Sequence, residues 1–248
     1  MVAKLKQLYN KSLFQPTFLG LFFNPFFIIR SGLYKGVSQF SNHMRGKLLD
    51  FGCGSKPYKA LFSVSEYVGT DIEVSGHDHR HEEIDVYYDG ETLPFADESF
   101  DSIFSSEVFE HVFNLSQILN ELHRVLRPGG RMLLTVPFVW DEHEIPYDFA
   151  RYTSFGLKHI LQEKGFIVVQ EKKTTNYVST ICQMWAAYVY QHIFPQRKVL
   201  RIALTPLFIT PITLSGLFLS AILPKNTNFF HNNVMVVQKP ANRSEINQ

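Results

Sequence analysis

A short apolar stretch that ends in two glycines, followed by a second apolar stretch that ends in an acid, constrains this chain more than any other feature. The first stretch covers residues 48–54, and one residue separates Gly52 from Gly54. The second covers residues 67–71 and closes with Asp71. In such a layout the glycines let the backbone approach a ligand closely, and the acid accepts hydrogen bonds from two ribose hydroxyls. The pattern predicts a nucleoside-binding site that suits either NAD, for hydride transfer, or S-adenosylmethionine (SAM), for methyl transfer.

Strand and helix patterns alternate along the middle of the chain, which predicts an α/β fold with a mostly parallel sheet. Helices are expected over residues 115–126, where apolar side chains recur at helical spacing, and from Thr153 or Ser154 to Lys164. Residues 127–130, which include a proline and two glycines, should stop the first of these helices. Strands are expected over residues 47–51, 67–72, 84–88, 99–105, 131–136, 166–170 and 233–237.

The length of 248 residues suits one α/β domain with additions. The expected segments are a Phe-rich N-terminal extension (1–45), the core (46–170), an apolar helical insertion (171–230), the last core strand (231–240) and a tail (241–248). The extension is first basic and then apolar, as a signal peptide would be. However, Asn24 and Pro25 interrupt the apolar run and no small-residue cleavage site follows, so a cleaved signal is not expected.

Charge and cysteine content exclude two classes of protein. The formal net charge is +1 and the chain has no stripe of Lys and Arg, so no nucleic-acid partner is expected. Cys53 and Cys182 lie far apart and provide no disulfide framework, which fits a reducing cytosol.

Residues 77–81 place three histidines, an aspartate and an arginine next to one another. A metal site and a solvated loop both fit this run. No second ligand cluster has recognisable spacing, so no metal site is predicted.

Four blocks in a fixed order resemble the class I SAM-dependent methyltransferases, in the group with a type 11-like methyltransferase domain. The blocks are residues 48–54, 67–71, 93–101, and 110–112 leading to 124–130. The resemblance covers about residues 46–170 and the last strand. It implies SAM as the cofactor and a Rossmann-like fold whose seven-stranded, mostly parallel sheet has an antiparallel last strand. It disfavours an NAD(P)-binding oxidoreductase, because Ser55 and Lys56 break the glycine spacing of that class.

The resemblance also implies which residues hold SAM. The loop after the first strand cradles the methionine part, and Asp50 helps to hold its ammonium group. Asp71 binds the ribose, and the acid after the third strand accepts from the adenine amino group, although Asp89 and Gly90 would also form a turn. Lys56 replaces the third glycine of the usual run, and its side chain reaches the SAM carboxylate or the acceptor, or else points to solvent. The predicted cofactor-binding residues are Asp50, Gly52, Cys53, Gly54, Asp71, Ile72, Asp89, Gly90 and Ser106.

A polar, aromatic segment of residues 140–152 follows the fifth strand, beside the expected position of the SAM methyl group. His143 is the predicted general base because imidazole titrates near neutral pH, and His111 is the alternative. Arg151 could hold an anionic acceptor, whereas a loop held together by an Asp148–Arg151 pair is the structural alternative. The predicted acceptor-binding residues are Tyr147, Asp148, Arg151 and Tyr152.

Two stretches of the insertion, residues 174–196 and 202–223, contain no Asp, Glu, Lys or Arg. The second is long enough to span a bilayer, but it lies between two strands that should be neighbours in one sheet, and a single crossing would separate them. Three arrangements remain: a hairpin with residues 177–194, a helix at the membrane interface, or a lid packed on the protein. We expect interfacial association at the inner face of the membrane of a cytoplasmic protein. The residues expected to contact lipid are Leu204, Leu207, Phe208, Ile212, Leu217, Phe218 and Leu219.

Together these patterns predict a SAM-dependent methyltransferase that acts on a small-molecule, glycan or lipid-linked acceptor, with oxygen as the expected methylated atom. A non-catalytic SAM-fold binding protein is an alternative, which the intact Asp50, Gly52, Gly54 and Asp71 disfavour. The sequence predicts no particular oligomeric state.

Overall fold

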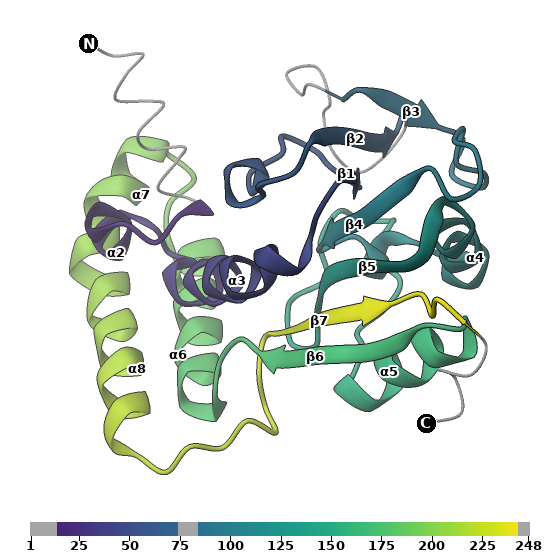
Figure 1. Ribbon diagram of the computed structural model, residues 1–248. Coiled ribbons are helices and arrows are strands. Elements are labelled where there is room, and N and C mark those ends of the chain that lie inside the picture. The colour runs from purple at the N-terminus through teal and green to yellow at the C-terminus, as the bar shows by residue number, and fades with distance from the viewer. Residues whose placement is uncertain (1–13, 74–83, 243–248) are drawn as a thin grey trace. The chain divides into compact units, whose positions relative to one another are not determined.

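The computed structural model describes residues 14–73 and 84–242, and the chain divides into two compact units (Figure 1). The sheet unit comprises Val37–Lys172 and Asn233–Gln248, and the helical unit comprises Met1–Gly36 and Lys173–Asn232. Most of the N-terminal extension and the insertion, which the sequence suggested as separate segments, therefore share one unit. The histidine-rich run of residues 77–81 lies outside the described residues.

In the described residues a seven-stranded sheet has the strand order β3-β2-β1-β4-β5-β7-β6. Its strands are β1 (Lys47–Phe51), β2 (Glu66–Ile72), β3 (Val86–Tyr88), β4 (Phe100–Ser106), β5 (Leu126–Pro137), β6 (Ile167–Lys173) and β7 (Asn232–Gln238). Parallel pairs join β1 to β2 and β4, β2 to β3, and β4 to β5. β7 lies between β5 and β6 and points the opposite way to β6 (Figure 1). The predicted fold class is confirmed, as is the predicted pairing of the last two strands.

The helices of the sheet unit bury one face each against this sheet. α4 (Leu115–Val125) buries Leu115, Ile118, Leu119, Leu122 and Val125 in the main core. In α5 (Ser154–Glu163), Thr153 caps the first turn because its Oγ1 accepts a hydrogen bond from the Gly156 N–H at 3.1 Å. Short 3₁₀ turns occur at η1 (Ser41–His43), η2 (Lys59–Leu61) and η4 (Phe109–His111). The described residues that directly follow β1 and β4 form turns rather than α-helices.

β5 begins earlier than predicted. The run from Arg127 to Gly130 does stop α4, but it continues as a strand rather than as a loop. Gly129 donates its N–H to the Lys239 carbonyl at 2.8 Å, and Lys239 donates back to the Gly130 carbonyl at 2.9 Å. The ammonium of Lys239 also satisfies two carbonyls at the end of α4, those of His123 and Leu126. The segment after β7 thus supplies the partners that extend β5.

The helical unit contains α2 (Phe18–Phe23), the start of α3 (Phe27–Phe40), α6 (Tyr177–Tyr188), α7 (Lys198–Leu204) and α8 (Thr210–Ile222), with π-helical turns at Val189–Ile193 and Thr205–Ile209. Gln183 of α6 is buried, and its side chain joins the insertion to the N-terminal extension. Its amide oxygen accepts from the Ile28 N–H at 3.1 Å, and its amide nitrogen donates to the Pro25 carbonyl at 2.9 Å. Gly216 of α8 faces Cys182 of α6 so closely that a Cβ would lie 2.7 Å from the cysteine Cβ.

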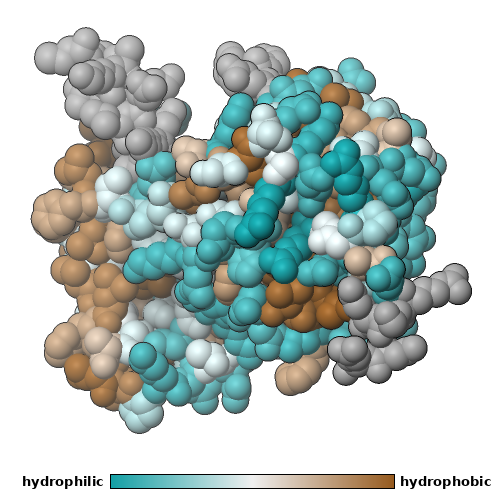
Figure 2. Space-filling view, viewed as in Figure 1, coloured by the Kyte–Doolittle hydropathy of each residue, from teal (hydrophilic) through white to brown (hydrophobic). Residues whose placement is uncertain are grey.

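Lys198–Ile222 is one helix of 25 residues. Its most apolar window has a mean hydropathy of 1.9, and 28% of that window is buried. By length and composition it could cross a membrane, and in the described part of the chain no other helix meets that test. Hydrophobic side chains gather over α7 and α8 in Figure 2. Side chains along this helix that are more than half exposed include Val199, Leu207, Phe208, Phe218 and Ile222.

Candidate functional site

The loop after β1 brings together the predicted glycines and the predicted ribose acid. Gly52 and Gly54 both adopt positive φ angles, +70° and +43°, which a side chain would strain. The Gly54 N–H donates to Asp71 Oδ2 at 2.9 Å, so the end of β2 holds the turn that follows β1. The other carboxylate oxygen accepts from the Ile72 N–H at 2.9 Å. Asp71 therefore stands at the carboxyl edge of the sheet beside the glycine turn, as the sequence predicted for a nucleoside site.

Asp50 lies below this loop and is 2% exposed. Burial raises the pKa of its carboxyl to about 7, against the opposing effect of a hydrogen bond from the Tyr67 hydroxyl. That hydroxyl donates to Asp50 Oδ2 at 2.5 Å. The neighbouring Cys53 thiol is also buried, which raises its pKa, so it is inert packing in the loop rather than a nucleophile.

Lys56 does not point to solvent, and its contact with the SAM carboxylate or the acceptor stays a prediction. Its ammonium lies 2.7 Å from Asp85 Oδ2, and the side chain is only 8% exposed. The lysine side chain passes over Gly69, where an added Cβ would lie 2.3 Å from Lys56 Cε. Asp85 also accepts the Gly69 N–H at 2.6 Å. Lys56 thus ties the glycine turn to the start of β3, and Asp85 is a residue that the sequence reasoning missed.

Asp89 forms the turn that the sequence offered as the alternative to an adenine contact. One carboxylate oxygen, Oδ1, accepts from the backbone N–H groups of Thr92 at 2.7 Å and Glu91 at 2.8 Å. These hydrogen bonds lower the pKa of Asp89. Gly90 has a φ of +85° and open space around it. The adenine contact of this pair and the cofactor contact of Ser106, whose hydroxyl lies 2.9 Å from that of Thr135, stay predictions.

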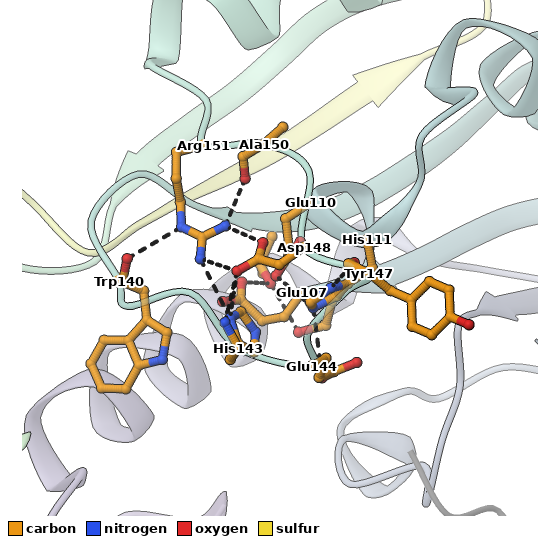
Figure 3. Close-up of polar contacts among 12 residues, drawn as sticks. Glu107, Glu110, His111, Trp140, His143, Glu144, Tyr147, Asp148, Ala150 and Arg151 are labelled. Atoms are coloured by element: carbon orange, nitrogen blue, oxygen red, sulfur yellow. Dashed lines mark hydrogen bonds and ion pairs between the residues drawn. The ribbon is translucent and has the colours of Figure 1, made fainter. Parts of the chain in front are cut away.

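The segment of residues 140–152 folds back onto η4 and builds a second polar cluster (Figure 3). The Phe149 N–H donates to the Glu110 carbonyl at 2.8 Å, and His111 Nδ1 lies 2.8 Å from the Tyr147 carbonyl. The rings of His111 and His143 meet edge to face with centroids 4.7 Å apart. The two histidines predicted as alternative bases therefore lie side by side.

Glu110 is fully buried at the centre of this cluster, and sequence reasoning did not include it among the site residues. Among the described residues, neither of its carboxylate oxygens has a hydrogen-bond partner, and His111 Nε2 has none either. Burial, followed by the nearby charge of Glu107, raises the pKa of Glu110 well above its usual value. Burial also lowers the pKa of His111. A ligand atom from each of Glu110, His111 and His143 lies within 4.8 Å of the others, although no metal site was predicted.

Arg151 is bound to its own loop. Its two terminal nitrogens lie 2.5 Å and 2.6 Å from the two oxygens of Asp148, and it also donates to the Asp141 carbonyl at 2.8 Å. Burial would raise the pKa of Asp148, but the hydrogen bonds from Arg151 and from the His143 N–H outweigh it and lower the pKa to about 2. The loop held together by an Asp148–Arg151 pair, which the sequence offered as the structural alternative, is thus present. Roles in acceptor binding for Arg151, for half-exposed Tyr147 and for Tyr152, which packs against the core, stay predictions.

The two halves of the site adjoin within the sheet unit. A Cβ on Gly52 would lie 2.4 Å from Val108 Cγ2, in the segment that leads into η4. Val108 is thus in direct contact with the glycine turn, and Glu110 and His111 follow it in the chain. The turn that would hold a nucleoside cofactor therefore adjoins the segment that carries the histidine cluster.

Comparison with known proteins indicates a methyltransferase domain. A family profile described as a methyltransferase domain matches residues 49–134. The chain is 33% identical to the ubiquinone/menaquinone biosynthesis C-methyltransferase UbiE of Pseudoalteromonas translucida over 40% of its length and 38% of that protein. It is 33% identical to the malonyl-[acyl-carrier protein] O-methyltransferase of Erwinia pyrifoliae over 36% of each chain. The chain thus spans less than two fifths of the length of these relatives.

Among solved structures, one similar fold is phosphoethanolamine N-methyltransferase 2 of Haemonchus contortus, in complex with S-adenosylhomocysteine. The TM-score is 0.51 and the identity 17%, over 84% of this chain and 52% of that one. At that identity the likeness concerns the fold alone. The matched profile shows that residues 49–134 carry a methyltransferase domain, and this likeness shows the class I methyltransferase fold.

Proposed function

We propose that this protein transfers the methyl group of SAM to an oxygen atom of a small-molecule, glycan or lipid-linked acceptor. The observation that carries the proposal is the cluster of His111, His143 and buried Glu110 next to the glycine turn. The cluster offers a proton acceptor on the side where a nucleophile would approach the cofactor. The two relatives compared above are named as a C-methyltransferase and an O-methyltransferase. Of these two kinds of acceptor, a hydroxyl group depends most on a base that removes its proton.

The chemistry requires little from the protein beyond orientation and proton removal, because the sulfonium of SAM is already activated. The acceptor oxygen attacks the methyl carbon, the carbon–sulfur bond breaks, and its electron pair stays on sulfur to give S-adenosylhomocysteine. His143 Nδ1 lies 3.2 Å from Asp148 Oδ2 and 3.2 Å from the Asp141 carbonyl. Arg151 Nη2 lies farther away, at 3.4 Å. The two closer acceptors therefore favour a proton on Nδ1, which leaves the other ring nitrogen to receive the acceptor proton.

The proposal is tested by incubating the full chain with methyl-labelled SAM and with water-soluble and lipid extracts, followed by mass spectrometry. We expect label in one acceptor class as an O-methyl ether or ester. Label on carbon would contradict the assignment to oxygen. SAM binding with no label transferred to either extract would favour the non-catalytic binding protein.

Asp50 makes SAM binding depend on pH. An ammonium group pairs with the ionised carboxyl, and the pKa of about 7 means that half of the Asp50 side chains are protonated near neutrality. Raising the pH from 6 to 8 removes this proton, so SAM affinity should rise by about tenfold. Calorimetric titration at both pH values measures the change. Asp50→Asn should bind SAM equally at pH 6 and 8, and a wild-type affinity that is the same at both would contradict the pairing.

We further propose that the helical unit rests on the inner face of the membrane in the cytoplasm. Support comes from the exposed apolar side chains of α7 and α8 and from exposed Arg197 and Lys198, which suit anionic head groups. Of the seven side chains predicted to contact lipid, Leu207, Phe208, Leu217 and Phe218 are exposed and Leu219 is half-buried. Leu204 and Ile212 pack instead on a small core of Ala186, Val189, Phe194 and Ile209.

Liposome flotation tests this contact. Wild-type protein should float with anionic vesicles at low salt, and Leu207→Asp with Phe218→Asp should reduce the floated fraction at least tenfold, since each buried side chain contributes about 1.5–3 kcal/mol. Phe155→Asp, at a 79% exposed position on α5 of the sheet unit, is the matched control and should float like the wild type. Wild-type protein that stays with the soluble fraction would leave the lid as the explanation of this surface.

A further inference from the structure

In the polar cluster around Glu110, carboxylate oxygens and an imidazole nitrogen of described residues face one another without forming a hydrogen bond. Glu110 Oε1 lies 3.8 Å from His111 Nε2, and Glu144 Oε1 lies 3.6 Å from the same nitrogen. Both distances are too long for a hydrogen bond. Both Glu110 oxygens and His111 Nε2 are shielded from solvent. A buried carboxylate of this kind costs several kcal/mol unless a positive charge or a proton compensates it.

The contacts around the two imidazoles favour a proton on Nδ1 of each ring. His111 Nδ1 lies 2.8 Å from the Tyr147 carbonyl, an acceptor, so the proton sits on Nδ1 and Nε2 keeps its lone pair. His143 Nδ1 lies 3.2 Å from Asp148 Oδ2 and from the Asp141 carbonyl and 3.4 Å from Arg151 Nη2, so two closer acceptors outweigh one more distant donor and favour the proton on Nδ1. A carboxylate or carbonyl that accepts one ring N–H while the other nitrogen stays free is the arrangement found behind histidine ligands of metals.

Among the described residues, the charge of Arg151 acts to lower the pKa of Glu110 but does not outweigh the effect of burial. The Arg151 guanidinium is itself held by both oxygens of Asp148. The carboxylates that surround the cluster in Figure 3 are Glu107, Glu144 and Asp148. Protonation of Glu110 would supply a donor, but the facing nitrogen is 3.8 Å away and would gain no hydrogen bond from it. A bound cation satisfies all three groups together.

We propose that Glu110, His111 and His143 bind a divalent first-row metal cation, and that this ion takes the acceptor oxygen as a further ligand. Two imidazoles and one carboxylate form the donor set of catalytic zinc sites, which keep an open position for water or substrate. Ligands at about 2.0–2.2 Å from one ion lie no more than about 4 Å apart. The observed limit of 4.8 Å therefore requires only a small contraction of the side chains.

The inference rests on the proposed function, because it gives the acceptor hydroxyl a defined position beside the cofactor. A hydroxyl bound to a divalent ion has a lowered pKa and loses its proton to solvent before the methyl group is transferred. The resulting oxygen attacks the methyl carbon as the carbon–sulfur bond breaks. His143 then acts as a ligand, and an acceptor with a hydroxyl group free to coordinate is preferred over a hindered or purely carbon nucleophile.

Zinc binding by the full chain tests the site without any need for an acceptor. Metal-stripped protein is titrated with Zn²⁺ by calorimetry, and the bound metal is counted by mass spectrometry after buffer exchange. We expect one tightly bound ion per chain. Glu110→Gln, which keeps the shape of the buried side chain, and His143→Ala should each weaken binding by at least tenfold. His159→Ala, an exposed histidine on α5, should not.

A second control separates this site from the histidine-rich run. Replacement of His77, His79 and His81 by alanine should leave the tight binding unchanged, and loss of binding in that variant alone would overturn the assignment. Absence of Zn²⁺ and Mn²⁺ binding to wild-type protein would also overturn it. If SAM binding and methyl transfer persist in the presence of a chelator, the metal site is wrong while the proposed function stands. If SAM does not bind, the proposed function fails whether or not zinc binds.

Discussion

Replacing Asp71 with alanine is expected to weaken SAM binding by roughly 30- to 1,000-fold, which corresponds to about 2–4 kcal/mol. The carboxylate would accept hydrogen bonds from both ribose hydroxyls, and its Oδ2 already accepts the Gly54 N–H at 2.9 Å. The substitution therefore removes the ribose contact and also releases the glycine turn. Calorimetric titration of the full chain measures the loss, and a thermal melt of the same sample reports whether the fold is retained.

Glu66→Ala provides the matched control for this substitution. Glu66 lies on the same strand as Asp71 but at its amino end, where it pairs at the surface with Lys47 at 3.0 Å. SAM affinity should be unchanged in that variant. An Asp71→Ala protein that binds SAM as tightly as the wild type would show that the ribose lies elsewhere.

Replacing His143 with alanine is expected to reduce methyl transfer by roughly 10²–10⁴-fold, the usual contribution of a group that handles a proton in the transition state. SAM affinity should change little, because His143 belongs to the loop after β5 and not to the turn after β1. The rate of methyl transfer should fall whether the His143 ring receives the proton itself or holds the cation that activates the acceptor. Initial rates at saturating SAM, with the affinity measured in parallel, separate the two effects.

His159→Ala is the control for turnover as it is for metal binding. That side chain is 74% exposed and pairs with Glu163 on its own helix. Its loss should leave the rate as in the wild type. A reduction of less than tenfold in His143→Ala would contradict a direct role and leave His111, or desolvation of the acceptor, to account for the chemistry.

The parts of the fold that follow from local pattern could be predicted from the sequence. β1 spans Lys47–Phe51, as expected, because a short, mostly apolar run suits a central parallel strand and Gly52 ends it. Thr153 caps α5 as its position suggested. The early start of β5 could not be predicted, because the run with Pro128 and Gly129 is stabilised by Lys239 from the far end of the chain.

The candidate site, too, could be predicted from the sequence only in part. Gly54 and Asp71 were expected together, since the carboxyl ends of neighbouring parallel strands share one edge. Glu110 was missed because sequence alone cannot report that a carboxylate in a short 3₁₀ turn is fully buried. The Lys56–Asp85 pair was missed for a related reason. Gly69 was the available signal, because only a residue without a Cβ leaves room for the lysine to cross β2.

Titration of the purified full chain with SAM, S-adenosylhomocysteine and NADH by calorimetry tests most directly whether the turn after β1 and Asp71 hold SAM. Micromolar-scale binding of SAM and S-adenosylhomocysteine to one site per chain is expected, with no heat from NADH. That affinity should fall in Asp71→Ala and persist in Glu66→Ala. Clear binding of NADH with no binding of SAM would contradict the assignment of cofactor and reaction together.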